Sequence, residues 1–242
     1  MFRETKARSI LKTFSWRILA TLTTTLLVYI FTKRIKIALA IGAVEFAAKI
    51  IIYFFHERLW NKISFGRKDI MPFVIWFTGL PSSGKAEFAD AVCKTLSEKS
   101  FKVERLHGSK IRGILPRTGF SKEDRDKHIK RVGLLANILE NNKIVVVASF
   151  VSPYQEARNF VRKICDNFIE IYMNTPLREC QKRDKKGLYK KAKEGLLSNF
   201  TGIDGPYEPP QNPELVIDAS RISLDEGVKK ILDYLDKKDL LR

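Results

Sequence analysis

The chain has 242 residues, of which 45% are hydrophobic, and its 44 Lys and Arg against 27 Asp and Glu give a formal net charge of +17. The basic excess is densest in residues 1–70, which are also the most apolar, and this combination favours a membrane anchor over a nucleic-acid-binding module. The three cysteines are isolated and form no zinc-binding motif, as is typical of reduced thiols in a cytosolic protein.

Two apolar runs of 19 residues lie near the start of the chain. The first, FSWRILATLTTTLLVYIFT, covers 14–32, and the second, IALAIGAVEFAAKIIIYFF, covers 37–55. A helix rises about 1.5 Å per residue, so each run comes close to the ~30 Å thickness of a bilayer core. Eight basic residues flank the pair on its outer sides and three lie in the connecting turn. This bias predicts a transmembrane hairpin with both termini in the cytoplasm.

The second apolar run carries one acidic and one basic residue, Glu45 and Lys49. Their spacing of four places them on one helical face, so we expect them to neutralise each other while packing on the first helix or on a second copy of the chain. A role in helix packing and a role in an ion pathway both remain open. Residues 9–66 resemble a family of short two-helix bacterial and archaeal membrane proteins of unknown function, which supports the hairpin.

A glycine-rich motif follows the Met71-Pro72 break. The apolar run at 73–78 predicts a buried strand, which leads into GLPSSGK at 79–85 and then into a helical pattern. Strand, glycine loop and helix form the context of a phosphate-binding loop. The predicted ATP-binding residues are Gly79, Leu80, Pro81, Ser82, Ser83, Gly84, Lys85 and Ala86, with Lys85 reaching the outer phosphates as a catalytic residue. The residue after the lysine is normally a Ser or Thr that ligates Mg²⁺, and here it is Ala86.

Strand and helix patterns alternate along the rest of the chain. Strands are predicted at 102–106, 143–149, 168–173 and 214–217, and helices near 121–141, 154–166, 176–195 and 223–238. Ser121 and Ser152 are predicted to cap the first two of these helices. The pattern predicts an α/β fold of the P-loop NTPase type, a parallel sheet with helices on both faces, preceded by the transmembrane α-helical hairpin. The expected domains are 1–70 and 71–242.

Five segments resemble adenylylsulfate kinases: WFTGLPSSGK, GFSKEDRDKHIKRV, FVSPYQEAR, RDKKGLYKKA and NFTGIDGPYEPPQNPE. The resemblance spans about residues 73–235. It implies transfer of the γ-phosphate of ATP to the 3′-hydroxyl of adenylylsulfate in sulfate assimilation, with Mg²⁺ as the metal. It also implies a sulfonucleotide site formed by Arg112, Phe120, Arg125, Val151, Ser152, Lys186, Asn199 and Phe200. The basic run at 182–193 is compatible with a lid over polyphosphate and with a solvated helix.

The chain departs from this family where the resemblance implies metal and acceptor-hydroxyl chemistry. The family sequence Asp-Gly-Asp-Asn is replaced by His107, Gly108, Ser109 and Lys110, so both aspartates are missing. His107 is a candidate base because imidazole titrates near neutrality, although a histidine at a strand end is also compatible with a structural role. Glu87 and Asp90 are the available substitutes for a metal ligand, and the metal site is otherwise unknown.

Three functions remain open at this point. The first is an active membrane-tethered adenylylsulfate kinase. The second is a non-catalytic relative that binds ATP or a sulfonucleotide and reports it through the hairpin. The third is a membrane protein in which the kinase-like domain serves for assembly. The expected partners are adenylylsulfate, membrane lipid and a further copy of the chain, but not nucleic acid. The expected location is the membrane, with the kinase-like domain in the cytoplasm.

Overall fold

The computed structural model describes residues 2–4, 8, 10–12, 14–16, 18–20, 23, 36–63, 65, 67–69, 71–115 and 119–241. The chain divides into two compact units, Met1–Ile70 and Met71–Arg242. In the first unit, the short strand β1 (Phe2–Glu4) pairs antiparallel with β2 (Arg67–Asp69). The long helix α2 (Lys36–Lys62) lies between them in sequence.

A buried arginine ties the start of the first unit to the end of α2. The guanidinium of Arg8 donates hydrogen bonds to the carbonyl oxygens of Trp60, Ile63 and Phe65 at 2.5, 2.7 and 2.6 Å. These carbonyls lie at or just beyond the C-terminal end of α2, where helical partners are missing. Arg8 therefore caps α2 from a distant part of the chain.

Further contacts continue from Arg8 along α2. Lys12 forms an ion pair with Glu57 at 3.1 Å, and the hydroxyl of Ser15 lies 3.0 Å from Nε2 of His56. The described residues between 8 and 23 have helical backbone. Arg8, Lys12 and Ser15 contact successively earlier positions of α2, so the described part of 8–16 runs antiparallel to the last turns of α2.

The structure describes only part of the predicted transmembrane hairpin. In the described part of the chain, no helix is both long and apolar enough to cross a membrane. The second predicted span, 37–55, falls within α2. The first, 14–32, is described only at 14–16, 18–20 and 23, so the rest of it lies outside the described residues, as does the side chain of Glu45.

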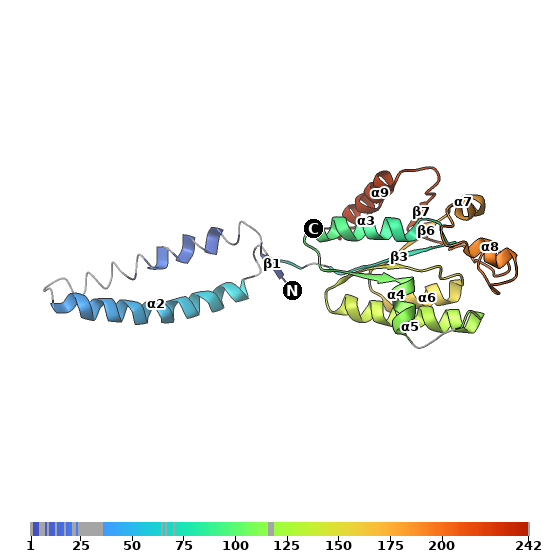
Figure 1. The fold of residues 1–242 in the computed structure, drawn as a ribbon. Coiled ribbons are helices and arrows are strands. Elements are labelled where there is room, and N and C mark those ends of the chain that lie inside the picture. Colours follow the sequence, from blue (N-terminus) through green and yellow to red (C-terminus); the bar gives the residue numbers. More distant parts are fainter. Residues whose placement is uncertain are drawn as a thin grey trace. The chain divides into compact units, whose positions relative to one another are not determined.

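The second unit is built on a five-stranded sheet in the order β4-β5-β3-β6-β7, and all neighbouring strands are parallel (Figure 1). The strands are β3 (Val74–Gly79), β4 (Val103–His107), β5 (Val145–Ser149), β6 (Phe168–Met173) and β7 (Leu215–Ile217). Every residue of β3 is buried, because the strand is paired on both edges and covered on both faces. The predicted parallel sheet is therefore confirmed.

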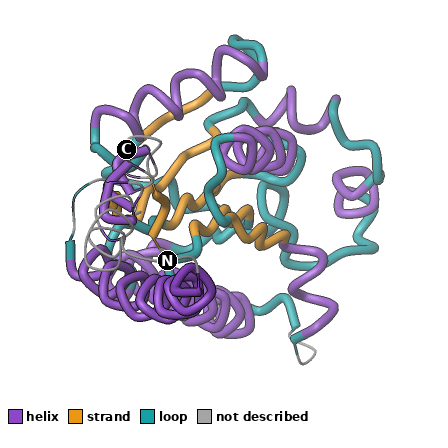
Figure 2. Tube along the Cα trace, turned by 90° about the vertical axis from the view of Figure 1, so that its left-hand side faces the viewer, coloured by secondary structure: helices purple, strands orange, loops and turns teal. Residues whose placement is uncertain are grey.

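Helices cover both faces of this sheet (Figures 1 and 2). Helices α3 (Lys85–Glu98) and α9 (Leu224–Lys237) pack on the face that carries Ile75 and Phe77. Helices α5 (Lys122–Asn141) and α6 (Gln155–Ile164) pack on the face that carries Val74 and Trp76. The alternation along β3 thus supplies both hydrophobic cores from one strand.

Two predicted helical features differ from the structure. The helix expected at 176–195 is two short helices, α7 (Leu177–Lys182) and α8 (Leu188–Lys193), because Gly187 adopts a left-handed φ of 63° and the Asp184 carboxylate accepts a hydrogen bond from the Tyr189 amide.

Ser152 does not cap α6, whose N-cap residue is Tyr154. The predicted cap at Ser121 is confirmed, since its hydroxyl accepts a hydrogen bond from the Asp124 amide. One short helix, α4 (Gly108–Ile114), was not predicted.

A chain of charged side chains fastens α6 to the sheet. Arg158 and Glu170, both almost fully buried, form an ion pair at 2.9 Å. Glu170 also lies 3.1 Å from Arg162, which in turn pairs with Glu214 at 2.5 Å. The two arginines come from α6, and the two carboxylates come from β6 and from the segment just before β7. The paired charges offset much of the cost of removing each from water.

We expect the Glu170→Gln substitution to lower the free energy of unfolding by about 3 kcal/mol, because it leaves the buried Arg158 without its anionic partner. Chemical denaturation of the full-length protein measures this loss. The Glu156→Gln substitution is the control, since it removes a carboxylate from an exposed ion pair with Lys130 and should change stability little. Equal losses for the two variants would contradict the importance of the buried network.

Candidate functional site

The loop between β3 and α3 has a backbone that requires glycine at both ends. Gly79 has a φ of 145°, and a Cβ atom there would lie 2.7 Å from the carbonyl oxygen of Met173. Gly84 is the N-cap residue of α3 with a left-handed φ of 94°, and no side chain caps the helix. The amide groups of the first turn of α3 are therefore available to an anion, as in phosphate-binding loops.

Lys85, the first residue of α3, folds back over this loop. Its ammonium group donates hydrogen bonds to the carbonyl oxygens of Gly79 and Leu80 at 3.0 and 2.5 Å, and to the hydroxyl of Ser83 at 3.2 Å. Burial lowers the pKa of Lys85 to about 7. The side chain is thus poised between its charged and neutral forms at neutral pH.

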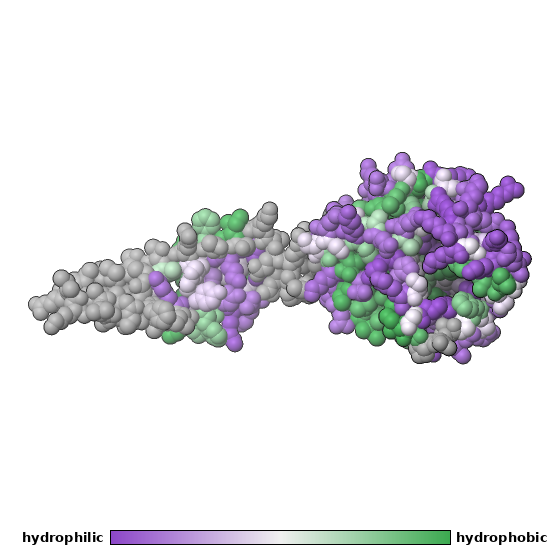
Figure 3. Space-filling model, in the orientation of Figure 1, coloured by the Kyte–Doolittle hydropathy of each residue, from purple (hydrophilic) through white to green (hydrophobic). Residues whose placement is uncertain are grey.

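A cavity of about 1250 Å³ opens next to the loop. Its basic lining residues are Lys85, Arg112, Arg125, Lys182, Arg183, Lys185 and Lys186, and its acidic ones are Glu87 and Asp184. Hydrophilic side chains also dominate much of the visible outer surface of this unit (Figure 3). The excess of positive charge in a concave site suits a ligand that carries several negative charges.

Most of the predicted site residues line this cavity. From the loop these are Pro81, Ser82, Ser83, Gly84, Lys85 and Ala86. From the predicted sulfonucleotide site they are Arg112, Phe120, Arg125, Val151, Ser152, Lys186 and Phe200, and His107 also lies there. Gly79, Leu80 and Asn199 are not lining residues, but each contributes a carbonyl oxygen that holds a basic side chain. The Asn199 carbonyl accepts a hydrogen bond from Arg125 at 2.6 Å.

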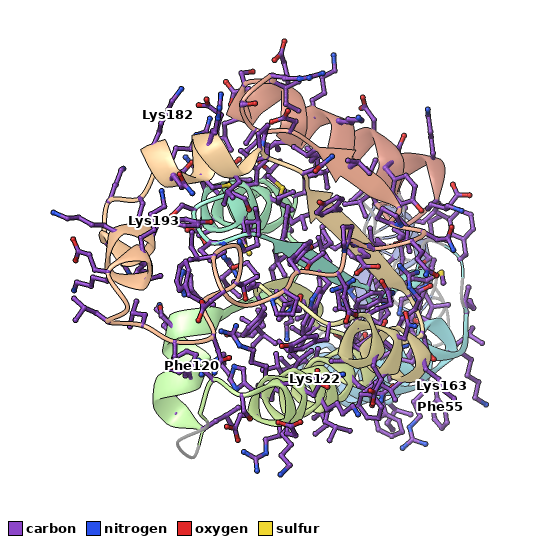
Figure 4. The ribbon with its side chains drawn as sticks, turned by 90° about the vertical axis from the view of Figure 1, so that its right-hand side faces the viewer. Phe55, Phe120, Lys122, Lys163, Lys182 and Lys193 are labelled. Atoms are coloured by element: carbon purple, nitrogen blue, oxygen red, sulfur yellow. The ribbon has the colours of Figure 1, made fainter. Side chains whose placement is uncertain are left out.

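Phe120 has two arginine side chains near its ring. The guanidinium carbons of Arg112 and Arg125 lie 4.7 and 5.5 Å from the centroid of its ring. The Phe120 side chain is 55% exposed, and in Figure 4 it lies below Lys182 and Lys193, near α4. The arrangement offers a flat surface for an aromatic ring and fixed cations for its anionic substituents.

The hydroxyl of Ser152 makes its hydrogen bonds inside the kinase-like unit. Its hydroxyl accepts a hydrogen bond from the indole of Trp76 at 3.1 Å and donates one to Thr78 at 2.9 Å. Its φ of 38° is left-handed, and its carbonyl oxygen accepts a hydrogen bond from Arg158. Because the hydroxyl is hydrogen-bonded to Trp76 and Thr78, Ser152 lines the cavity mainly with its backbone.

His107 is the N-cap residue of α4. Its Nδ1 atom accepts a hydrogen bond from the Ser109 amide at 3.2 Å and lies 2.9 Å from the Ser109 hydroxyl. The ring proton must then be on Nε2. Burial, followed by the charge of Arg105, lowers the pKa of His107. The imidazole is therefore neutral at pH 7, but its basic nitrogen is already used to start a helix.

The residues around the loop do not fit a Mg²⁺ site. Ala86 has no side-chain oxygen, and Asp90, one of the predicted substitutes, is held in an ion pair with Arg105 at 2.8 Å. Among the residues that the structure describes, no three His, Cys, Asp or Glu side chains gather in a way that could hold a metal ion. Glu87 lines the cavity as a single carboxylate.

Two residues at the site were not predicted from the sequence. Arg105, in β4, reaches the end of β5 and donates a hydrogen bond to the Ser149 hydroxyl at 2.8 Å. His128, in α5, lines the cavity while only 2% exposed, and neither of its ring nitrogens contacts a hydrogen-bonding group of the described residues. Burial and the charges of Arg112 and Arg131 lower the pKa of His128 to about 4, so it is neutral at pH 7. The sequence held one signal for each of these residues: Arg105 is a charged residue within a predicted strand, and His128 lies on the buried face of a predicted helix.

Comparison with known families assigns two regions of the chain. Residues 71–218 match the family described as adenylylsulphate kinase. Residues 10–61 match a family described as "Predicted membrane protein (DUF2061)". The first match covers more than half of the chain and includes the whole phosphate-binding loop.

Individual relatives agree with this assignment. The adenylyl-sulfate kinase of Halothermothrix orenii is 47% identical over 165 residues, covering 68% of this chain and 89% of its own. The structure of the Mycobacterium tuberculosis APS kinase CysC in complex with AMPPNP and APS is 36% identical with a TM-score of 0.66, covering 69% and 99% of the two chains. The hexameric APS kinase from Thiobacillus denitrificans is 29% identical with a TM-score of 0.55, covering 71% of this chain and 30% of its own.

We expect the affinity of the full-length protein for inorganic tripolyphosphate to fall by up to ~10-fold per pH unit above about pH 7, because a neutral Lys85 has to take up a proton when the anion binds. Calorimetry in buffers of different ionisation enthalpy measures both the affinity and the proton uptake. The Lys85→Met variant should bind more weakly and without proton uptake. An affinity that stays constant as the pH rises would contradict the lowered pKa.

Proposed function

The chain belongs to the adenylylsulfate kinase family, and on that premise we propose that residues 71–242 bind ATP and adenylylsulfate and transfer the γ-phosphoryl group of ATP to the 3′-hydroxyl of adenylylsulfate. The observation that carries this proposal is the single cavity that joins the phosphate-binding loop to the residues of the predicted sulfonucleotide site. The product would be phosphoadenylylsulfate, and the N-terminal unit would hold the enzyme at a membrane.

The loop and the basic segment after β6 are assigned to ATP. The amides at the start of α3 and the ammonium of Lys85 would bind the β- and γ-phosphates. Lys182 and Lys186 line the same cavity and lie on or after the short helix α7. Their ammonium groups would neutralise part of the charge of a polyphosphate.

The other end of the cavity is assigned to adenylylsulfate. Phe120 and Phe200 offer aromatic faces to an adenine ring, and Arg112 and Arg125 beside Phe120 offer charge to the phosphosulfate group. Val151 and the backbone of Ser152 would limit where the sugar can lie. His128 lies in the same wall, and its ring nitrogens have no hydrogen-bond partner among the described residues.

A second candidate function is nucleotide binding with little or no turnover. It is favoured by Ala86, His107 and Ser109, which replace groups that a kinase of this type uses for metal binding and for the acceptor hydroxyl. Phosphoryl transfer depends on positioning and on neutralisation of the transferred group, so these losses lower the rate more than the affinity. A protein of this kind would report the level of ATP or a sulfonucleotide.

We propose that the N-terminal unit is a membrane anchor with the spans 14–32 and 37–55. Support comes from the two apolar runs of the sequence and from the match to a family of predicted membrane proteins. The kinase-like unit would then lie in the cytoplasm, next to membrane lipid. Self-association through either unit is part of the proposal, and a hexameric APS kinase is among the structures that this chain resembles.

We expect the purified full-length protein to phosphorylate adenylylsulfate more slowly than the ~1–100 s⁻¹ usual for kinases, because three contributors to transition-state stabilisation are replaced. The combined change Ala86→Ser, His107→Asp and Ser109→Asp should raise turnover by at least ~10-fold, a conservative part of the range for such contacts. A coupled assay with ATP, adenylylsulfate and excess Mg²⁺ measures both rates. An unmodified protein with ordinary kinase turnover would contradict the importance of these three positions.

We expect both ends of the chain to lie in the cytoplasm, because the basic residues flanking the two apolar runs outnumber those in the turn by eight to three. Alkaline phosphatase, which is active only outside the bacterial cytoplasm, should be inactive when fused after Arg242 and active when fused after Arg34. The Arg34 fusion is the positive control for membrane insertion. The reverse pattern of activities would contradict the topology.

A further inference from the structure

Tyr189 lies between the phosphate-binding loop and the turn that carries Phe200. It is only 2% exposed, and it is not among the residues that line the cavity. The turn passes close to the loop, because a Cβ atom at Gly202 would lie 3.2 Å from the Leu80 side chain and 3.7 Å from the Tyr189 ring. Tyr189 is therefore placed to hold both segments without touching a ligand.

The hydroxyl of Tyr189 binds the loop. It donates a hydrogen bond to the carbonyl oxygen of Pro81 at 2.9 Å. Burial raises the pKa of Tyr189, so the hydroxyl keeps its proton and remains a donor at and well above neutral pH. The Tyr189 backbone is itself held, because its amide donates a hydrogen bond to the Asp184 carboxylate at 2.7 Å. The side chain thus reaches the loop from a fixed point at the start of α8.

This hydrogen bond sets the direction of one peptide group of the loop. The C=O and N–H groups of a planar trans peptide point in opposite directions. Because the Pro81 carbonyl points to Tyr189, the Ser82 N–H points away from it. In the part of the chain that the structure describes, no oxygen atom accepts a hydrogen bond from this N–H, and Ser82 lines the cavity. The N–H is therefore available to an oxygen of a bound polyphosphate.

The backbone of Ser82 needs such support. Its φ of 58° is left-handed, a conformation that costs free energy in a residue with a side chain and persists where neighbours hold it. The preceding carbonyl, of Pro81, is held by Tyr189, and the carbonyl of Ser83 accepts a hydrogen bond from the Thr175 hydroxyl at 3.0 Å. Loss of the Tyr189 hydroxyl would release one of these two supports.

The ring of Tyr189 supports Phe200, which lines the part of the cavity assigned to adenylylsulfate. The two rings pack edge to face, with centroids 5.1 Å apart and an interplanar angle of 81°. Arg125 holds the same turn, because it donates hydrogen bonds to the Asn199 carbonyl and the Thr201 hydroxyl. The Tyr189 ring limits the positions open to Phe200, and so it sets where an aromatic ring of a ligand can stack.

We propose that Tyr189 is a positioning residue for both ends of the cavity. Its hydroxyl orients the Pro81–Ser82 peptide for a polyphosphate, and its ring orients Phe200 for adenylylsulfate. The second role rests on the proposed function, because it takes adenylylsulfate as the ligand of Phe200. Since the hydroxyl and the ring act on different ligands, removing them separately should change different affinities, which a contribution to stability alone would not do.

Removal of the hydroxyl alone is the first test. Calorimetric titration of the full-length Tyr189→Phe variant with inorganic tripolyphosphate, at one fixed pH, should give an affinity about 3- to 10-fold lower than that of the unmodified protein, as for loss of one hydrogen bond. The affinity for adenylylsulfate should stay the same. The control is Tyr234→Phe, which removes a hydroxyl from α9 outside the cavity lining and should change neither affinity.

Removal of the ring is the second test. The Tyr189→Leu variant should also lose at least ~3-fold of its affinity for adenylylsulfate, as for loss of an aromatic contact. Because this effect is exerted through Phe200, the losses of Tyr189→Leu and Phe200→Leu should not add in the double variant. Additive losses would contradict the role of the ring. If Tyr189→Leu does not fold, Tyr189→Met replaces it.

Other results would also overturn the inference. Unchanged tripolyphosphate affinity of Tyr189→Phe would exclude the role of the hydroxyl, and equal losses of both affinities would leave only a structural role. If tripolyphosphate does not bind the unmodified protein, the inference falls together with the assignment of the loop to ATP. If tripolyphosphate binding responds to Tyr189→Phe but adenylylsulfate does not bind, the acceptor assignment of the proposed function and the role of the ring are wrong, and the role of the hydroxyl stands.

Discussion

The close passage of the end of β3 past β6 is the constraint on which the rest of the site depends. Gly79 lies so near the carbonyl of Met173 that a Cβ atom has no room, and this contact sets the direction in which the chain leaves the sheet. The loop then places Gly84 at the start of α3, and α3 packs its apolar side on the sheet through Phe88 and Val92. A substitution at Gly79 would shift the loop, the amide groups at the start of α3 and Lys85 together.

The electrostatic character of the cavity follows from what this backbone arrangement leaves unpaired. The uncapped start of α3, the buried Lys85 and the arginines around Phe120 all favour negative charge. The basic residues that line the cavity outnumber the acidic ones, which favours the binding of anions. The kinase-like fold is thus compatible with two chemical outcomes, slow transfer and simple retention of the nucleotide.

Sequence patterns were sufficient for elements that depend on local or periodic signals. The strand and helix around Gly79 and Lys85, the parallel sheet, and the cap at Ser121 all followed from such signals. The division of 176–195 into two helices was not predicted, because lysine-rich sequence has good helical propensity and the break depends on one left-handed glycine. Arg105 was missed because its role depends on neighbours from α3 and β5, which only the folded sheet brings together. The hydrogen bond from the Trp76 indole to the Ser152 hydroxyl was missed for the same reason, because the two residues are 76 positions apart in sequence.

The ion-pair network of Arg158, Glu170, Arg162 and Glu214 limits which substitutions can accumulate during evolution. Removing Glu170 leaves the buried Arg158 without its anionic partner, and removing Arg162 leaves Glu214 without its cationic partner, so the two central residues are costly to change singly. Substitutions at the catalytic positions meet no such barrier once selection for turnover is relaxed. In members of the family that have stopped transferring phosphoryl groups, we therefore expect the charged residues beneath α6 to be retained longer than the residues that carried out the reaction.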